Sequence, residues 1–190
     1  MNMKIVKIEI CEKIEREISM TLRKAERKDL ARVMEITRSV VPLMQAAGNT
    51  QWSDVYPSLP RFEQDCNNGS LYVYEDGGGI SGFVVVDDEH PAAYGSIGWK
   101  VPWTKSAAMH RMAVDPASQG KGFAGYMVKS VESMLVDRGY AAIHTDTSLE
   151  NGKMQYQFEK WGFEFRERLH LDENEDDWYV AYEKVFKTDE

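Results

Sequence analysis

A short glycine-rich loop carries the strongest chemical signal in this sequence of 190 residues. The segment Val114-Asp-Pro-Ala-Ser-Gln-Gly-Lys-Gly-Phe-Ala-Gly leads from an apolar, strand-like stretch directly into a helical pattern. Gly120 and Gly122 allow backbone conformations that other residues avoid. The free N–H groups of the helix's first turn lie at the positive end of its dipole, and Lys121 adds one positive charge. These features predict a site that holds a pyrophosphate mainly through backbone N–H groups.

Two other phosphate-binding patterns fit this loop less well. A Walker loop requires Gly-Lys followed by Ser or Thr, whereas Gly122 follows Lys121. The segment from Gly120 to Gly125 matches Gly-x-Gly-x-x-Gly, but a dinucleotide-binding fold places that pattern after the first strand of a βαβ unit. Here a meander of antiparallel-type strands precedes the loop. A nucleotide-binding domain, and a helix start with incidental glycines, are the alternatives.

Two segments resemble signatures of the GNAT N-acetyltransferase superfamily. Gln119-Gly-Lys-Gly-Phe-Ala124 is similar to the family's Gln/Arg-x-x-Gly-x-Gly/Ala motif, which cradles the pyrophosphate of coenzyme A. The stretch from Asn151 to Phe163 is similar to the second signature, an Asn that opens a helix ending in Glu-Lys-x-Gly-Phe. The resemblance covers residues 19–187 and leaves residues 1–18 as an N-terminal extension. It implies a single α+β domain whose mixed, mostly antiparallel sheet has a central splayed parallel strand pair and is flanked by helices.

The resemblance also implies acetyl-CoA as the cofactor, bound where the central strands part. The main chain of Met112 and Val114 would pair with the pantetheine arm. The implied cofactor-binding residues are Met112, Ala113, Val114, Gln119, Gly120, Lys121, Gly122, Phe123, Ala124, Gly125, Asn151, Met154 and Phe158. The implied reaction is transfer of an acetyl group from the CoA thioester to an amine of a small molecule or a peptide.

Acetyl transfer to an amine needs a base, because an alkyl ammonium group has a pKa of about 10.4. His110 is the first candidate, since the ordinary histidine pKa of about 6.5 suits this role. Strand alternation predicts that His110 shares a face with Met112. Asp146 and His144 share a face of the neighbouring strand and can orient His110 or bind a cationic amine. We predict His110 and Asp146 as catalytic residues and His144 as a substrate contact; a hydrogen-bonded core histidine is the alternative for His110.

The sequence departs from the family at one position. GNAT enzymes often place a tyrosine that protonates the leaving thiolate in the last helix, and Phe158 occupies that position here. Tyr156 cannot simply replace it, because residues two apart point to different sides of a helix. Either another donor serves, or the thiolate leaves without a dedicated acid, or the chain is a catalytically weak CoA-binding sensor or regulatory module.

The acceptor side is less closely specified. The stretch 48–57 lies between the first two predicted helices, where the family commonly builds part of its acceptor pocket. Trp52 and Tyr56 are predicted substrate residues, because an aromatic wall can attract an amine through cation–π contacts. The alternative is that both rings anchor a long loop to the core. His90 and His170 are expected at the surface.

The elements that must position these residues follow from hydrophobic periodicity and turn signals. Apolar residues between Leu30 and Val41 lie at helical spacing, and Pro42 and Gly48 end or kink that helix. A second helix begins near Ser58. Strands are predicted over 20–23, 71–74, 80–86, 94–99, 109–114 and 141–147, helices over 123–135 and 151–161, and two terminal strands around the acidic turn 172–177. The strand–helix–strand–helix order of the second half implies one parallel crossover within a mixed sheet.

Composition and charge narrow the classes of function. The net charge of −8 argues against non-specific binding to nucleic acids or anionic membranes and leaves room for a cationic acceptor. Cys11 and Cys66 are the only cysteines, which excludes a disulfide framework and leaves no second pair for a zinc site. Charges interrupt the apolar N-terminal stretch, unlike a secretory signal. We expect a cytoplasmic protein with no metal and no nucleic-acid or membrane partner, and the resemblance allows a homodimer.

Overall fold

The computed structural model describes residues 20–77, 79–171 and 177–187. The predicted N-terminal extension, residues 1–18, and most of the acidic turn, residues 172–176, lie outside the described residues. The strands are β1 (Thr21–Lys24), β2 (Leu71–Glu75), β3 (Ile80–Asp87), β4 (Ser106–Val114), β5 (Ala142–Ser148), β6 (Glu164–Leu169) and β7 (Tyr179–Val185). The α-helices are α2 (Leu30–Ala46), α3 (Leu59–Asn67), α4 (Phe123–Asp137) and α5 (Gly152–Lys160).

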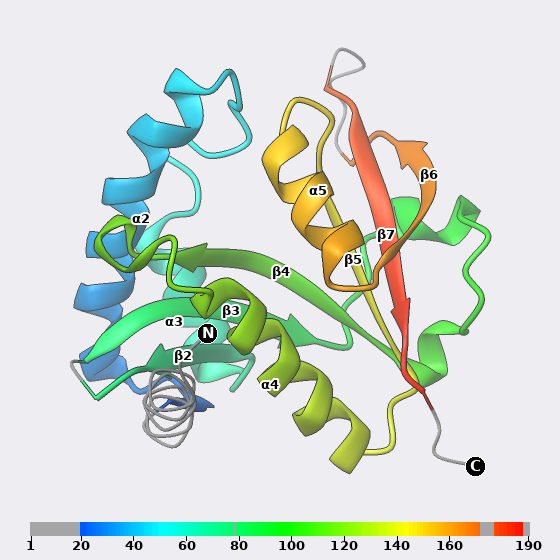
Figure 1. The fold of residues 1–190 in the computed structure, drawn as a ribbon, viewed down its shortest axis with the longest axis horizontal. Coiled ribbons are helices and arrows are strands. Elements are labelled where there is room, and N and C mark those ends of the chain that lie inside the picture. The colour runs from blue at the N-terminus through cyan, green and yellow to red at the C-terminus, as the bar shows by residue number, and fades with distance from the viewer. Residues whose placement is uncertain (1–19, 78, 172–176, 188–190) are drawn as a thin grey trace, which may run out of the picture.

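The strands form one mixed sheet in the order β1-β2-β3-β4-β5-β7-β6 (Figure 1). Only β4 and β5 run parallel within this described sheet, and every other neighbouring pair is antiparallel. Helix α4 provides the crossover between the two parallel strands. The predicted α+β fold, with its central parallel pair in a mostly antiparallel sheet, is confirmed.

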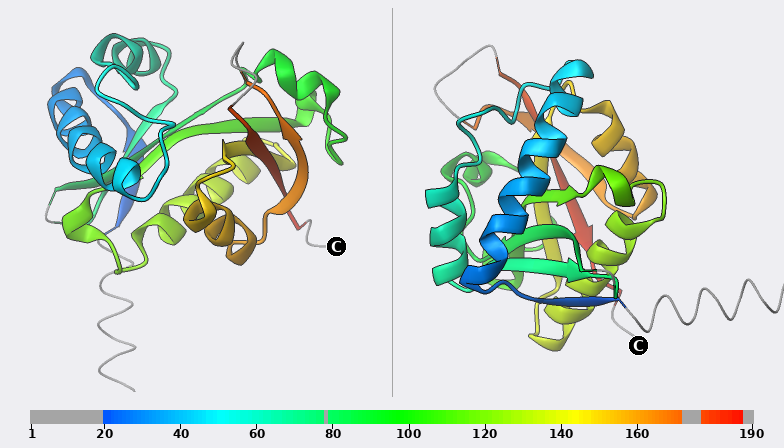
Figure 2. Two further views of the ribbon diagram at one scale, coloured as in Figure 1. Left: turned by 90° about the horizontal axis from the view of Figure 1, so that it is seen from above. Right: turned by 90° about the vertical axis from the view of Figure 1, so that its left-hand side faces the viewer.

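Helices cover both faces of the sheet (Figure 2). Helices α2 and α3 pack on the face that carries Val73 and Val85, here called the α2–α3 face. Helices α4 and α5 pack on the opposite face, which carries Val84 and Met109 and is here called the α4–α5 face. Because successive residues of a strand point to opposite sides, each strand contributes alternately to the two hydrophobic layers.

Two predicted elements differ in the structure. The first helix continues through Pro42 and ends at Ala46, just before Gly48, whose φ is +81°. The predicted strand over 94–99 is wrong, because Ala92–Ser96 forms a 3-10 helix that packs Tyr94 over β6 and β7. Tyr94 and Ile97 are three residues apart, a spacing that brings side chains to one side of a 3-10 helix but to opposite faces of a strand. No described helix combines the length and the apolar character needed to span a membrane.

Candidate active site

Strands β4 and β5 pair over only part of their length. The parallel ladder runs from Ser106 opposite Ala142 to Met109 opposite Thr145, although β4 continues to Val114. Thr145 Oγ1 donates a hydrogen bond of 2.9 Å to the carbonyl oxygen of Met109 at the last paired position. Beyond that position the strands part, as the resemblance to the GNAT superfamily implies for the central pair.

A bulge in β4 follows immediately after this splay point. Val85 of β3 lies opposite His110 and Phe83 lies opposite Ala113, so a step of two residues in β3 matches three in β4. Arg111 has a φ of 43°, a left-handed conformation that is uncommon for a residue with a side chain. This conformation places the extra residue of the bulge at Arg111.

An ion pair with helix α3 holds the bulge. Arg111 Nε and Nη2 donate hydrogen bonds of 3.0 Å each to Asp65 Oδ2 and Oδ1. Both side chains are almost completely buried. A bidentate pair in such surroundings fixes the geometry strongly, because losing either partner would leave a buried charge uncompensated.

The bulge reverses the alternation of side chains along β4. Met109 and Met112 both pack on the α4–α5 face. His110, which lies opposite Val85, is on the α2–α3 face instead. The prediction that His110 and Met112 share a face is therefore wrong, since simple alternation does not hold across an inserted residue.

A cavity of about 1230 Å³ opens where β4 and β5 part. The predicted cofactor-binding residues that line it are Met112, Ala113, Val114, Gln119, Gly120, Gly122, Phe123, Ala124, Gly125, Asn151, Met154 and Phe158. Lys121 does not line the cavity; its side chain is exposed, and Nζ lies 6.0 Å from the centroid of the Phe123 ring. The predicted positive charge at the loop is thus not aimed into the cavity.

The glycine loop has the backbone geometry that a phosphate cradle requires. Gly120 and Gly122 have φ values of +79° and +83°, and Gly122 is the N-cap of α4. The first-turn N–H groups of α4 have no acceptors within the helix. An added Cβ at Gly125 would lie 3.0 Å from Trp161 Nε1, so glycine there lets α4 approach the end of α5 closely. The loop therefore fits the pyrophosphate of CoA through backbone groups.

The start of α5 is tied to the end of β5 and to a distant loop. Asn151 caps the helix by accepting a 3.2 Å hydrogen bond from the backbone N–H of Met154, and its Nδ2 donates to Thr147 Oγ1 at 3.0 Å. Gln51 Oε1 accepts a 3.3 Å hydrogen bond from the backbone N–H of Ser148. Gln51 lines the cavity and was not identified from sequence, because its partner is 97 residues away along the chain.

His110 is the first residue beyond the splay point, and it lines the cavity. Its Nε2 lies 3.3 Å from the carbonyl oxygen of Glu89 and 3.6 Å from Asp87 Oδ1. A carbonyl oxygen can only accept a hydrogen bond, so Nε2 carries the proton. Within the described chain His110 Nδ1 has no hydrogen-bond partner, and this nitrogen keeps its lone pair.

Asp87 is adapted to stabilise a positive charge on His110. Burial alone would raise the pKa of Asp87, but the hydrogen bond and charge of His110 lower it overall. The backbone N–H of Glu89 also donates to Asp87 Oδ1 at 3.1 Å. The ionised carboxylate is thus retained beside the imidazole. Sequence reasoning missed Asp87, because it reaches His110 only through the pairing of β3 with β4.

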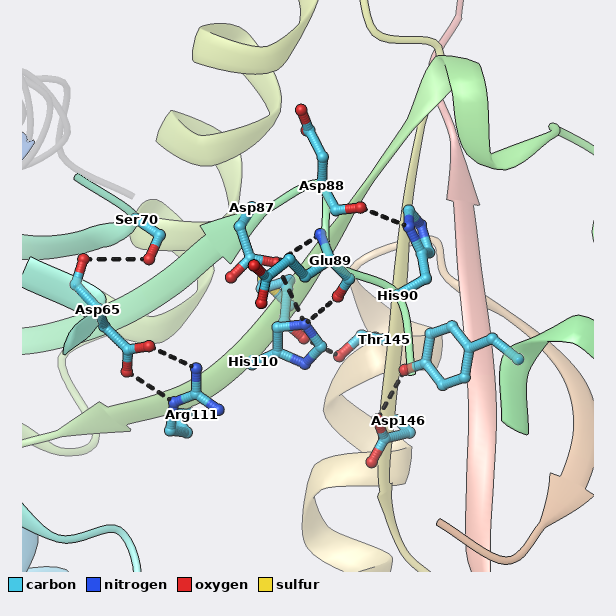
Figure 3. Close-up of polar contacts among 12 residues, drawn as sticks. Asp65, Ser70, Asp87, Asp88, Glu89, His90, His110, Arg111, Thr145 and Asp146 are labelled. Atoms are coloured by element: carbon cyan, nitrogen blue, oxygen red, sulfur yellow. Dashed lines mark hydrogen bonds and ion pairs between the residues drawn. The ribbon is translucent and has the colours of Figure 1, made fainter. Parts of the chain in front are cut away.

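Asp146 lies on the same sheet face as His110, one position beyond the last β4–β5 pair. Its Oδ2 accepts a 2.6 Å hydrogen bond from the hydroxyl of Tyr94. Burial raises the pKa of Asp146, while the charges of His110 and Arg111 act in the opposite direction. Figure 3 shows His110 between Arg111 and Asp146. Among the described residues Tyr94, and not His110, is the hydrogen-bond partner of Asp146, and the carboxylate that lies beside His110 Nε2 is that of Asp87.

The fold and these features agree with the comparison to known sequences. The sequence profile described as "Acetyltransferase (GNAT) family" matches residues 37–163, which is more than half of the chain. The chain belongs to the GNAT acetyltransferase family. Members of this family use acetyl-CoA, which is therefore its cofactor. A comparison with curated proteins gave no match.

Solved structures share the GNAT fold across almost the whole chain. A GNAT-family acetyltransferase from Streptococcus agalactiae has a TM-score of 0.78 at 23% identity, covering 89% of this chain and 96% of that one. The ribosomal-protein-S18-alanine N-acetyltransferase from Escherichia coli has a TM-score of 0.63 at 15% identity, with 90% and 96% covered. A Salmonella typhimurium protein solved with its cofactor acetyl-CoA has a TM-score of 0.59 at 18% identity, with 88% and 94% covered.

His144 is not part of the GNAT cavity. Its side chain is completely buried, its ring stacks on Trp99 at a centroid distance of 3.8 Å, and Nε2 lies 3.2 Å from Glu183 Oε1. Ser106 Oγ lies 3.2 Å from Nδ1. Both ring nitrogens are therefore occupied, and the prediction that His144 contacts the substrate is wrong. The residues that enclose it come from distant segments that strand alternation does not reveal.

His90 lies in the cavity although the sequence did not indicate a role for it there. It was expected at the surface, but it lines the cavity and stacks on Trp103 at a centroid distance of 5.0 Å. Its Nδ1 donates a hydrogen bond of 3.1 Å to the carbonyl oxygen of Asp88, and burial lowers its pKa. The Pro91 that follows suggested an exposed turn, but that turn folds back over the sheet. His170, also expected at the surface, is half-buried beside Trp178.

The predicted aromatic residues of the acceptor side occupy different environments. Trp52 is 5% exposed and stacks on Phe83 at a centroid distance of 6.3 Å, so it anchors its loop to the core. Tyr56 is 42% exposed. Both line the cavity. Trp52 thus shows that one residue can serve as an anchor and as a cavity wall.

Phe158, at the position of the family's tyrosine, has an aromatic ring without a hydroxyl group. It is 2% exposed and packs against Phe163, Tyr182 and Trp161. The hydroxyl of neighbouring Tyr182 lies 3.5 Å from Glu159 Oε1, and Tyr182 does not line the cavity. The aromatic cluster therefore offers no hydroxyl toward the cavity from Phe158 or Tyr182 that could replace the family's tyrosine.

Proposed function

We propose that this acetyltransferase acetylates a primary amine of a small molecule or peptide and that His110 is its general base. The observation that carries the proposal is the position of His110 at the splay point, with Nε2 held by the Glu89 carbonyl and Nδ1 unpartnered within the described chain. A base must offer a lone pair inside the site where the amine meets the thioester. Of the two residues predicted as catalytic, His110 offers an unpartnered ring nitrogen, whereas Asp146 is engaged by the Tyr94 hydroxyl.

The neighbouring carboxylates have separate tasks. Asp146, fixed by Tyr94, supplies a negative charge for the incoming ammonium group. Asp87, at 3.6 Å from Nε2, stabilises the imidazolium that forms when Nδ1 takes a proton. Asp146 thus stabilises the ammonium group before proton transfer, and Asp87 stabilises the imidazolium that the transfer produces.

Acetyl-CoA, when bound, supplies the acetyl group as a thioester, whose C–S bond breaks as the new C–N bond forms. Two protons leave the nitrogen between the ammonium group and the amide. His110 Nδ1 accepts the first and passes it to solvent, and then accepts the second and delivers it to the departing sulfur. One residue that alternates between base and acid removes the need for the tyrosine that Phe158 replaces.

Thiol release from acetyl-CoA across a panel of amines tests this function. His110→Ala should lower kcat by about 100-fold to 10,000-fold, with unchanged affinity for acetyl-CoA and partial rescue by added imidazole. His170→Ala is the matched control and should retain full activity. Asp146→Asn should mainly raise KM for the amine. Tight cofactor binding without amine-stimulated thiol release would overturn the proposal and favour the CoA-binding sensor.

A further inference from the structure

Two guanidinium groups line the cavity and share a single carboxylate. Arg111 makes the bidentate pair with Asp65, and Arg61 Nε lies 3.3 Å from Asp65 Oδ1. Despite that distance, Arg61 Nε is a buried atom with no hydrogen-bond partner. Asp65 is the only carboxylate within ion-pair distance of either guanidinium in the described part of the chain. The two guanidinium groups therefore share one ion-pair partner, and Arg61 has none of its own among the described residues.

The shared ion pair lies on the acceptor side of the site. Arg61 comes from α3, and Arg111 reaches the same helix, so both lie on the α2–α3 face with His110. The glycine loop leads into α4, which covers the opposite face. The sheet therefore separates Arg61 from α4, the helix that begins at the glycine loop.

Side chains of opposite charge, Arg111 and Asp146, flank His110 on this face of the sheet. Figure 3 shows Arg111 on one side of His110 and Asp146 on the other. Burial raises the pKa of Asp146 overall, and the positive charge of Arg111 acts against this shift, as it also acts on Asp87, so these groups lie within a short range of one another. A molecule with an ammonium group near one end and an anionic group near the other would match this pattern.

We infer that the acceptor molecule carries a carboxylate in addition to its amine, and that Arg61 binds this carboxylate. The inference rests on the proposed function, because it names the class of amine that the same site takes. Arg111 has its Nε and Nη2 committed to Asp65, whereas Arg61 makes no side-chain hydrogen bond within the described residues. The planar guanidinium group of Arg61 can donate two parallel hydrogen bonds to a carboxylate. The Arg61 side chain is 35% exposed and lines the cavity. An amino acid is the simplest acceptor of this kind.

Acceptors that share a side chain and a primary amine but differ in whether they carry a carboxylate test the inference. Phenylalanine, phenylalaninamide and phenethylamine present the same ring and amine, and leucine and methionine provide two further series. In the wild-type enzyme kcat/KM should be about 10- to 100-fold higher for the acid than for its amide in at least one series. Arg61→Gln should remove this preference by raising KM for the acid, with kcat and the amide's KM unchanged. Arg38→Gln, an exposed arginine of α2, is the matched control and should keep the preference.

The outcomes separate this inference from the function on which it rests. If the amides are turned over as fast as the acids in all three series, the inference is overturned while amine acetylation stands. The same conclusion follows if Arg61→Gln lowers kcat/KM equally for acids and amides, since a purely structural role would do that. If no acceptor stimulates thiol release, both the proposed function and the inference fail.

Discussion

Replacing His144 with glutamine measures how much a buried neutral histidine stabilises this fold and in which direction pH acts on it. The side chain is completely buried, and burial lowers its pKa to about 4. Glu183 accepts from Nε2, so Nδ1 is the acceptor for the Ser106 hydroxyl. Glu183 is already paired with Arg166 at 2.6 Å, and His90 lies edge-on at 5.3 Å. The cost of burying a charged imidazole therefore outweighs the stabilisation that Glu183 would give it.

The sign of the pH dependence follows from the lowered pKa. An unfolded histidine has a pKa of about 6.5 and takes up a proton more readily than folded His144. Protonation thus favours the unfolded chain, and the contribution of His144 is complete above about pH 6.5 and is lost as the pH falls toward 4. Between about pH 7.5 and about pH 5, the free energy of unfolding should fall by about 2 kcal/mol because of this residue alone.

Urea unfolding at these two pH values, followed by far-UV circular dichroism, provides the measurement. The wild-type protein should lose about 2 kcal/mol more than His144→Gln between the two conditions. His170→Gln controls for the loss of a histidine that is not enclosed in the core, and it should retain the wild-type slope. Equal losses in the wild type and His144→Gln would refute the reasoning, because the pH dependence would then come from other groups.

Two further substitutions have controls within the chain. Gly122→Ala and Gly139→Ala both place a side chain at a φ of +83°, so each should lower the free energy of unfolding by about 1 kcal/mol. Calorimetric titration with CoA should show weaker binding, by about 10-fold, for Gly122→Ala alone; equal affinities would argue against the loop as the cradle. Phe62→Ala, at a fully buried position beside Phe83, should cost about 3–5 kcal/mol in urea unfolding. Leu59→Ala, at an exposed position, should cost less than about 0.5 kcal/mol, and similar costs for both would contradict the assigned core.

Local patterns predicted the fold well, and contacts between distant segments explain the errors. The glycine loop and the helix that it opens depend on a few consecutive residues, so Gly120 and Gly122 could be assigned from sequence. The bulge could not, because the conformation of Arg111 is held by Asp65, 46 residues earlier in the chain. His144 was misassigned for the same reason, since its partner Glu183 is 39 residues away. No local pattern contains such information.

The bulge at Arg111 gives β4 two different roles. In a regular strand without the bulge, His110 and Met112 would share one face of the sheet, because they are two residues apart. With the bulge, His110 lies on the α2–α3 face, while Met112 and Val114 pack toward the α4–α5 face. The gap between β4 and β5 then joins the two sides of the sheet, because the cavity is lined from both. The overall charge of −8 thus does not conflict with an anionic cofactor. The glycine loop can hold the cofactor's phosphates through backbone groups, and it leads into α4 on the face of the sheet opposite Asp87 and Asp146.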